Sequence, residues 1–254
     1  ECGCDPLVAL QMATINTATH FGLERELGSI TPGRRADLII TSNLRELPIE
    51  RVIARGKTLA IDGKIIVKTK KFEWPNLVRK TVKLGKTLCA SDFFIKAPHQ
   101  SKSVKVKVIG VVENQAPTKA LSAELDVIDN LVQGNVLKDI CQVALVERHR
   151  ATGSVTNAFV SGFGYTGNCA VASTVAHDSH HMLVVGTNHK NMALAANRLG
   201  EVGGGITVWK DEREQALVKL PIAGLMSDEP AEEVALAVEK MVAAMEECGV
   251  TINN

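Results

Sequence analysis

The chain has 254 residues, of which 45% are apolar and 22% are charged, and its formal net charge is +1. This balance is typical of a globular protein, and the near-neutral charge excludes nucleic acid as its main partner. No run of about 18 apolar residues is present, so we expect no membrane-spanning helix and no membrane partner. The length suffices for two domains, each with its own hydrophobic core.

A helix is expected near the start of the chain. Asp5 can accept hydrogen bonds from the free amides of a first turn, and Pro6 stands where its missing N–H costs nothing. Asn16 is predicted to cap a second short helix, which Gly22 ends. We assign residues 1–27 to this helical piece.

Residues 28–70 have the pattern of a small all-β piece. Residues 38–40 predict a short buried strand. Residues 51–57 predict a second strand, and residues 58–61 are expected to continue it without a turn. Asp62 and Gly63 then form a strong two-residue hairpin signal before a last strand. The basic, polar stretch that follows indicates a solvated linker, so we place a domain boundary near residue 70.

Residues 71–254 predict a mixed α/β domain, so the chain as a whole is assigned to the mixed α/β (α+β) class. Residues 156–160 could form a strand or begin a helix, because their periodicity does not distinguish the two. Strands are predicted at residues 104–109, 144–148, 170–175, 182–185, 206–209 and 216–220.

Two helices are expected in this domain. Asn188 can cap a helix over residues 189–199. Near the carboxyl end, Ser227 and Asp228 are predicted to cap a last helix with Pro230 at a favourable first position. The apolar stripe of that helix is predicted to comprise Val234, Val238, Met241 and Met245.

The six cysteines are irregularly spaced and include no CxxC pair. This pattern favours free thiols in a reducing cytoplasm over a disulfide framework or a zinc site. The six are Cys2, Cys4, Cys89, Cys141, Cys169 and Cys248.

The densest polar cluster lies at a corner between two expected strands and consists of His177, Asp178, Ser179, His180 and His181. Histidine and aspartate move protons near neutral pH, so His177, Asp178 and His180 are our candidate catalytic residues. A metal site is the alternative functional interpretation, but such a site needs ligands from more than one corner. The structural alternative is that Asp178 and Ser179 cap the corner while the histidines hydrogen-bond buried carbonyls.

Three other segments allow both a functional and a structural interpretation. Residues 203–205, three glycines, could approach a phosphate or simply enter a hairpin, and they lack the context of a dinucleotide or Walker motif. The glycine-rich residues 162–167 could form a mobile loop over a ligand or a plain turn. Residues 147–150 could form an exposed charge network or contact a substrate or partner.

Residues 6–68 resemble the tail of an enzyme of the amidohydrolase superfamily. The resemblance rests on residues 12–16, 27–30 and 32–40. It implies that residues 1–27 are the last helices of an amidohydrolase TIM barrel and that residues 28–70 are strands of its β-sandwich.

Four further segments resemble the carboxyl-terminal domain of bacterial adenine deaminases, and we assign residues 71–254 to that domain. The segments are residues 146–153, 175–187, 203–206 and 220–227. The resemblance implies hydrolysis of adenine to hypoxanthine and ammonia in purine salvage, by a cytoplasmic homo-oligomer.

The resemblance also implies a dinuclear manganese or iron centre that activates water. The ligands of that centre belong to a barrel upstream of Glu1, so no metal ligand is assigned to this chain. The chain also begins without an initiator Met, and we therefore expect it to be part of a longer protein and inactive alone. One alternative is a non-catalytic domain that assembles subunits or shields the barrel active site. The other is an independent hydrolase with its own metal at residues 177–181.

Overall fold

The computed structural model describes residues 3–68 and 72–250, and these confirm the mixed α/β class. The chain divides into two compact units between Phe72 and Glu73. Cys2 lies outside the described residues, whereas the other five cysteines are free thiols, as predicted. No helix in the described ranges is long and apolar enough to cross a membrane.

The smaller unit begins with a continuous helical run of α1 (Pro6–Gln11), the π-helical turn η1 (Met12–Asn16) and α2 (Thr17–His20). Asp5 accepts hydrogen bonds from two backbone amides of the first turn, which confirms the predicted cap. The predicted cap at Asn16 is wrong. That residue has helical dihedrals and makes no capping bond, because the π-turn carries the chain directly into α2.

A four-stranded antiparallel meander completes the smaller unit. Its strands are β1 (Leu38–Thr41), β2 (Ile49–Ala54), β3 (Lys57–Ile61) and β4 (Lys64–Ile65). Asp62 and Gly63 form the predicted hairpin, with φ of 46° and 73°. The continuous strand predicted over residues 51–61 is wrong, because Arg55 and Gly56 form a turn between β2 and β3.

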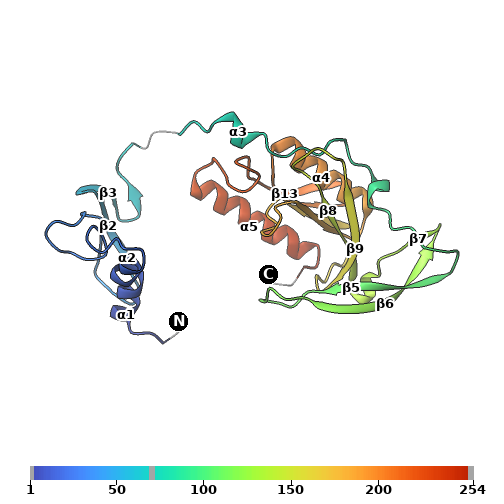
Figure 1. Cartoon of the computed structure of the whole chain (residues 1–254), viewed down its shortest axis with the longest axis horizontal. Coiled ribbons are helices and arrows are strands. Elements are labelled where there is room, and N and C mark those ends of the chain that lie inside the picture. The colour runs from blue at the N-terminus through green and yellow to red at the C-terminus, as the bar shows by residue number, and fades with distance from the viewer. Residues whose placement is uncertain (1–2, 69–71, 251–254) are drawn as a thin grey trace. The chain divides into compact units, whose positions relative to one another are not determined.

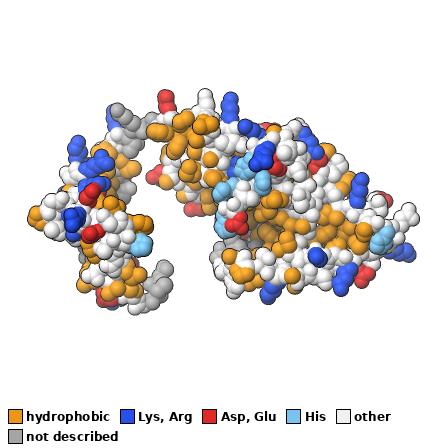
Figure 2. All heavy atoms as spheres, in the orientation of Figure 1, with side chains coloured by type: hydrophobic (Ala, Val, Ile, Leu, Met, Phe, Trp, Pro, Cys, Tyr) orange, Lys and Arg blue, Asp and Glu red, His pale blue; other side chains and the backbone are white. Residues whose placement is uncertain are grey.

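The strand predicted at residues 38–40 exists, but it is not buried within this unit. Ile39 is 51% exposed, and Ala18 is the one apolar side chain of the described smaller unit that is fully buried. Apolar side chains accordingly show on its surface (orange in Figure 2). The smaller unit therefore has a sheet and a helix but almost no core of its own.

The larger unit is built on a nine-stranded sheet (Figure 1). Neighbouring strands pair antiparallel except β5 and β9, which are parallel. Across the sheet, the order is β13 (Arg213–Lys219), β12 (Gly205–Lys210), β10 (Cys169–Ser173), β11 (Met182–Gly186), β8 (Ile140–Val146), β9 (Val155–Ser161), β5 (Ser103–Gly110), β6 (Lys119–Ile128) and β7 (Leu131–Val132).

Each strand predicted for this unit is present, and residues 156–160 prove to be part of β9. The strand β6, by contrast, was not predicted. Short helical turns lie outside the sheet at α3 (Asn76–Arg79), η2 (Ala90–Phe93) and η3 (Val136–Lys138).

Two helices cover opposite faces of the β13-to-β8 half of the sheet (Figure 1). The helix α4 (His189–Val202) begins at Asn188, whose side chain accepts from the Asn191 amide at 3.0 Å, as predicted. Its buried residues pack with Ala144, Val146, Ala170, Ala172, Met182 and Val184. The alternate residues of the same strands face the second helix, α5 (Ala231–Glu247). Because successive side chains of a strand point to opposite faces of the sheet, each face has its own hydrophobic core.

The start of α5 differs from the prediction. Pro230 is its N-cap residue and makes no side-chain capping bond. Asp228 instead pairs with Arg79 at 2.6 Å, a partner from the far end of the larger unit's sequence. Of the predicted apolar stripe, Met241 is buried and Val234 and Met245 pack beside it, whereas Val238 is 37% exposed.

Candidate functional site

One end of the nine-stranded sheet gathers loops from distant parts of the sequence. Residues 174–181, which we call the histidine corner, connect β10 to β11. Val146 at the end of β8 lies opposite Met182 at the start of β11, so the loop after β8 is adjacent to this corner. Ser173 at the end of β10 lies opposite Ile206, which brings the glycines at residues 203–205, where β12 begins, to the same place.

Arg148 ties these loops together. Its side chain is only 1% exposed, and burial lowers the pKa of the guanidinium. The guanidinium donates to the carbonyls of His180, Thr174 and Ala223, the last two at 3.4 and 3.3 Å. The exposed charge network that was one interpretation of residues 147–150 is therefore wrong for Arg148, which is part of the interior.

Thr174 is the second buried link and has no exposed surface. Its hydroxyl donates to the Gly224 carbonyl at 2.6 Å and accepts from the Gly205 amide at 2.8 Å. Through Arg148 and Thr174, the end of β8, the histidine corner, residues 203–205 and the segment after β13 form one hydrogen-bonded network.

Glu147 stabilises the loop that follows β8. Its carboxylate accepts from the amides of His149, Arg150 and Thr152 and from the Thr152 hydroxyl. Although burial acts to raise it, these bonds lower the pKa of Glu147 to about 2. The carboxylate of Glu147 thus stabilises the turn of its own loop.

The three candidate residues lie within this end of the sheet. His177 and Asp178 are 83% and 96% exposed, and His177 Nδ1 lies 3.1 Å from Asp178 Oδ1. His180 is half-buried and has a left-handed backbone with φ of 50°. Its backbone N–H donates a hydrogen bond to the Ala176 carbonyl, which supports this conformation. The corner therefore presents an imidazole–carboxylate pair to solvent.

Two further histidines contribute to the same surface. The rings of His149 and His181 are 4.9 Å apart, and His149 Nε2 lies 3.2 Å from the Ser179 carbonyl. The Nδ1 atoms of His180 and His181 are buried and have no hydrogen-bond partner among the described residues. Figure 2 shows histidine side chains (pale blue) gathered on the larger unit.

The structural interpretation of the corner is only partly correct. Ser179 does accept a bond from the His181 amide at 3.3 Å. Asp178 does not cap the turn but contacts His177. His180 and His181 leave a ring nitrogen unpaired rather than binding buried carbonyls with it.

A metal centre does not fit the residues that the structure describes. Within residues 3–68 and 72–250, no group of three or more His, Cys, Asp and Glu side chains is arranged to hold a metal ion. His177, Asp178 and His180 thus lack the set of ligands that a metal site requires. The described residues thus offer no ligand set for a dinuclear manganese or iron centre.

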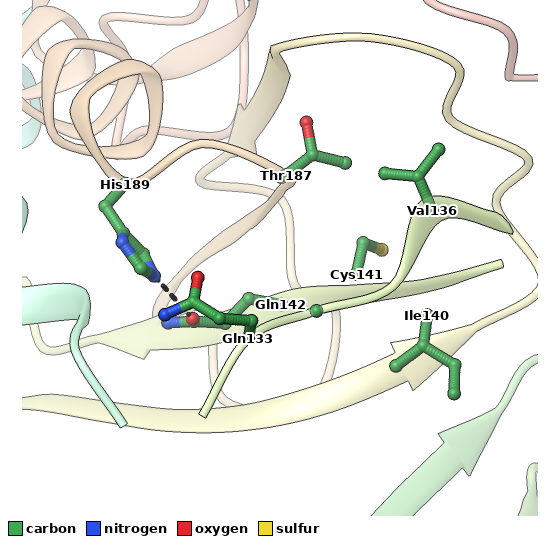
Figure 3. Close-up of a pocket in the computed structure, with 9 residues that line it drawn as sticks. Gln133, Val136, Ile140, Cys141, Gln142, Thr187 and His189 are labelled. Atoms are coloured by element: carbon green, nitrogen blue, oxygen red, sulfur yellow. Dashed lines mark hydrogen bonds between the residues drawn. The ribbon is translucent and has the colours of Figure 1, made fainter. Parts of the chain in front are cut away.

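A second polar site lies at the opposite end of β11. The cavity has a volume of about 60 Å³ and is lined by Gln133, Cys141, Gln142, Thr187 and His189, among others (Figure 3). A cavity of this size has room for a few ordered waters and is far below the roughly 300 Å³ typical of a small-molecule site.

The side chains of His189 and Gln142 in this cavity are hydrogen-bonded to each other. His189 points to Gln142, with Nε2 3.0 Å from Oε1 (Figure 3). Gln142 in turn donates to the Asn157 side chain and to the Phe93 carbonyl. Burial lowers the pKa of His189 and raises the pKa of Cys141 to about 12. His189 is close to the histidine corner in sequence, but the length of β11 separates the two.

The glycine-rich segments have structural roles. A Cβ on Gly205 would collide with the Val218 carbonyl, and one on Gly204 with Gly224, so residues 203–205 permit close packing at the hairpin entry. The loop of residues 162–167 is held by Asp139, whose carboxylate accepts from the amides of Gly162 and Gly164 at 2.8 and 2.7 Å. This anchoring favours the plain turn over a mobile loop.

Arg148 and Thr174 are the two site residues that sequence reasoning missed. A signal for Arg148 was present, because Ala144 and Val146 point to the α4 face and position 148 continues their period of two. A charged residue in such a register predicts a buried cation with polar partners. Thr174 offers no comparable signal, because its partners come from separate loops.

Two segments of the chain match known protein families. Residues 1–66 match the amidohydrolase family, which defines the class of protein to which the smaller unit is related. Residues 115–254, more than half of the chain, match the adenine deaminase C-terminal domain. The chain belongs to the adenine deaminase C-terminal domain family, and this confirms the resemblance found in the sequence.

Curated relatives extend the match to the whole chain. The chain is 67% identical over 254 residues to an adenine deaminase of Ruegeria sp. (strain TM1040) and covers 42% of that protein. It is 58% identical over 252 residues to an adenine deaminase of Mesorhizobium japonicum and 42% identical over 249 residues to one of Moorella thermoacetica. It covers 42% of the length of each of these proteins too.

Proposed function

We propose that this chain is the carboxyl-terminal part of an adenine deaminase that hydrolyses adenine to hypoxanthine and ammonia in purine salvage. Support comes from relatives that match 100% of this chain and carry that name. We assign residues 1–27 to the last helices of an amidohydrolase barrel, 28–70 to its β-sandwich and 71–254 to the carboxyl-terminal domain. The exposed apolar side chains of the smaller unit support this assignment, because they require neighbours to cover them.

The metal-activated water of this reaction belongs, in our proposal, to the barrel and not to the residues described here. Manganese or iron is the metal we infer from the family resemblance. We further propose a cytoplasmic enzyme, with which the free thiols are compatible. This chain alone is then inactive.

The contribution of this chain to chemistry is proposed to be the histidine corner, closing over the barrel mouth. His177 and Asp178 form a solvent-facing pair that can bind the purine or move a proton, and His180 supports them from within the corner. One observation carries the proposal: a solvent-exposed imidazole–carboxylate pair lies on a loop whose first residue, Thr174, is buried and hydrogen-bonded to neighbouring segments. A rigid scaffold that presents polar side chains on a loop is the usual architecture of a functional site.

The test is alanine substitution of His177, Asp178 and His180 in the full-length enzyme. We expect kcat/KM for adenine to fall by about 10²-fold or more at a proton-transfer residue. His99→Ala is the matched control, because His99 is an exposed histidine outside the corner. Unchanged turnover and unchanged adenine affinity in both His177→Ala and Asp178→Ala would exclude the proposal.

A non-catalytic role in assembly is the second candidate, and the outer face of α5 favours it. Val238 and Val242 are one helical turn apart and are 37% and 47% exposed on that helix. Such a face is typical of a contact between subunits of a homo-oligomer or with a neighbouring domain. This role predicts that Val242→Glu disrupts assembly of the full-length enzyme in sedimentation experiments, whereas His177→Ala leaves its activity intact.

A further inference from the structure

The guanidinium of Arg148 is a buried cation held entirely by backbone carbonyls. Among the described residues no carboxylate pairs with it, and its contacts are the carbonyls of Thr174, His180 and Ala223. Burying an unpaired charge is expensive, and an apolar side chain of similar volume often fills such a position at less cost. A contribution to stability alone therefore does not explain why this position is an arginine.

Two of the three carbonyls that Arg148 binds belong to the two ends of the histidine corner. Thr174 is its first residue, and His180 lies one residue before its end. Between them, the chain must reverse, and His180 adopts a left-handed backbone that non-glycine residues rarely take. The Arg148 Nε bond to the His180 carbonyl fixes the direction of that strained peptide.

The segment after β13 is shaped to admit the guanidinium. Gly224 has φ of 72°, and a Cβ built there would lie 2.8 Å from Arg148 Nη1. The planar, forked guanidinium reaches carbonyls on three sides at once, which the single ammonium of a lysine cannot do. The geometry thus requires arginine at position 148 and accommodates it with glycine at position 224.

We propose that Arg148 is the positioning residue of the histidine corner, which fixes the backbone of His180 and thereby places His177 and Asp178 for adenine deamination. The inference rests on the function proposed above, and it assigns to Arg148 no contact with substrate. A misplacement of catalytic groups by about 1 Å can reduce a rate by about 10²-fold. Loss of the hydrogen bonds from Arg148 to the histidine corner is therefore expected to slow the reaction while the fold persists.

The test compares Arg148→Lys with Arg150→Lys in the full-length enzyme. Arg150 is an exposed arginine of the same loop, so it controls for loss of a guanidinium near the corner. We expect Arg148→Lys to lower kcat/KM by about 10- to 100-fold. We also expect a change in the shape of its pH profile near neutrality, with full metal content retained. A merely structural role would reduce the active fraction and scale the whole profile without changing its shape.

A second variant covers the case in which Arg148→Lys does not fold. Gly224→Ala keeps the arginine but forces the guanidinium from its position, so it should change the pH profile in the same direction. Equal kinetics for Arg148→Lys and Arg150→Lys, or a profile that is only scaled, would overturn the positioning role. If the His177 and Asp178 variants are also unaffected, the proposed function itself has failed; if they are impaired, only the role of Arg148 has.

Discussion

Replacement of Thr174 by valine should destabilise the larger unit strongly, although the two side chains have nearly the same shape. Thr174 is fully buried, and its hydroxyl bonds the Gly224 carbonyl at 2.6 Å and the Gly205 amide at 2.8 Å. Each of these backbone groups would be left buried without its partner, at about 1–3 kcal/mol apiece. We therefore expect Thr174→Val to lower the free energy of unfolding by roughly 2–6 kcal/mol.

Urea unfolding followed by tryptophan fluorescence measures this loss. Trp209 on β12 packs against the α4 core, so its emission reports on the sheet that Thr174 closes. Thr174→Ser is the matched control, since it keeps the hydroxyl and removes one methyl group, for about 1 kcal/mol. A valine variant within 1 kcal/mol of the parent (about the value of one net hydrogen bond), or less damaging than the serine variant, would refute the hydrogen-bond reasoning.

Two further predictions concern buried titratable groups. Burial holds the pKa of His189 below its unfolded value of 6.5, so the folded state binds fewer protons in acid. Stability should be fully present above that pH and decline as the pH falls through it, and His189→Gln should flatten the decline in pH-dependent urea titrations. Iodoacetamide at pH 8 should label exposed Cys89 and spare buried Cys141, whose pKa is about 12, in peptide mass mapping. Rapid labelling of native Cys141 would contradict its burial.

Elements with strong local signals could be predicted from the sequence. Asp5 and Asn188 each accept from amides of the first helical turn, because capping depends on neighbouring residues only. The hairpin at Asp62 and Gly63 is equally local. The strand β6 also has a pattern typical of a strand, because Ala123, Leu125 and Val127 alternate with polar residues. Its sequence was therefore sufficient to predict it.

Features that depend on distant partners could not be predicted. Asp228 has the local character of a helix cap, but it pairs with Arg79, 149 positions away. The bonds of Thr174 to Gly205 and Gly224 likewise span 31 and 50 positions. The place of the histidine corner between two strands was predictable, whereas the network that supports it depends on the order of strands in the sheet.

The exposure of the histidine corner constrains where any chemistry could occur. His177 and Asp178, at 83% and 96% exposed, lie in water, where a charge pair is strongly screened and a substrate keeps its hydration. By contrast, the cavity around His189 is partly enclosed but is far smaller than the roughly 300 Å³ typical of a small-molecule site. Neither site is a complete active site within the larger unit. A catalytic role for the corner therefore requires that another part of a longer protein enclose it and exclude water. The buried hydrogen bonds of Arg148 and Thr174 would keep the corner in a fixed conformation for that contact.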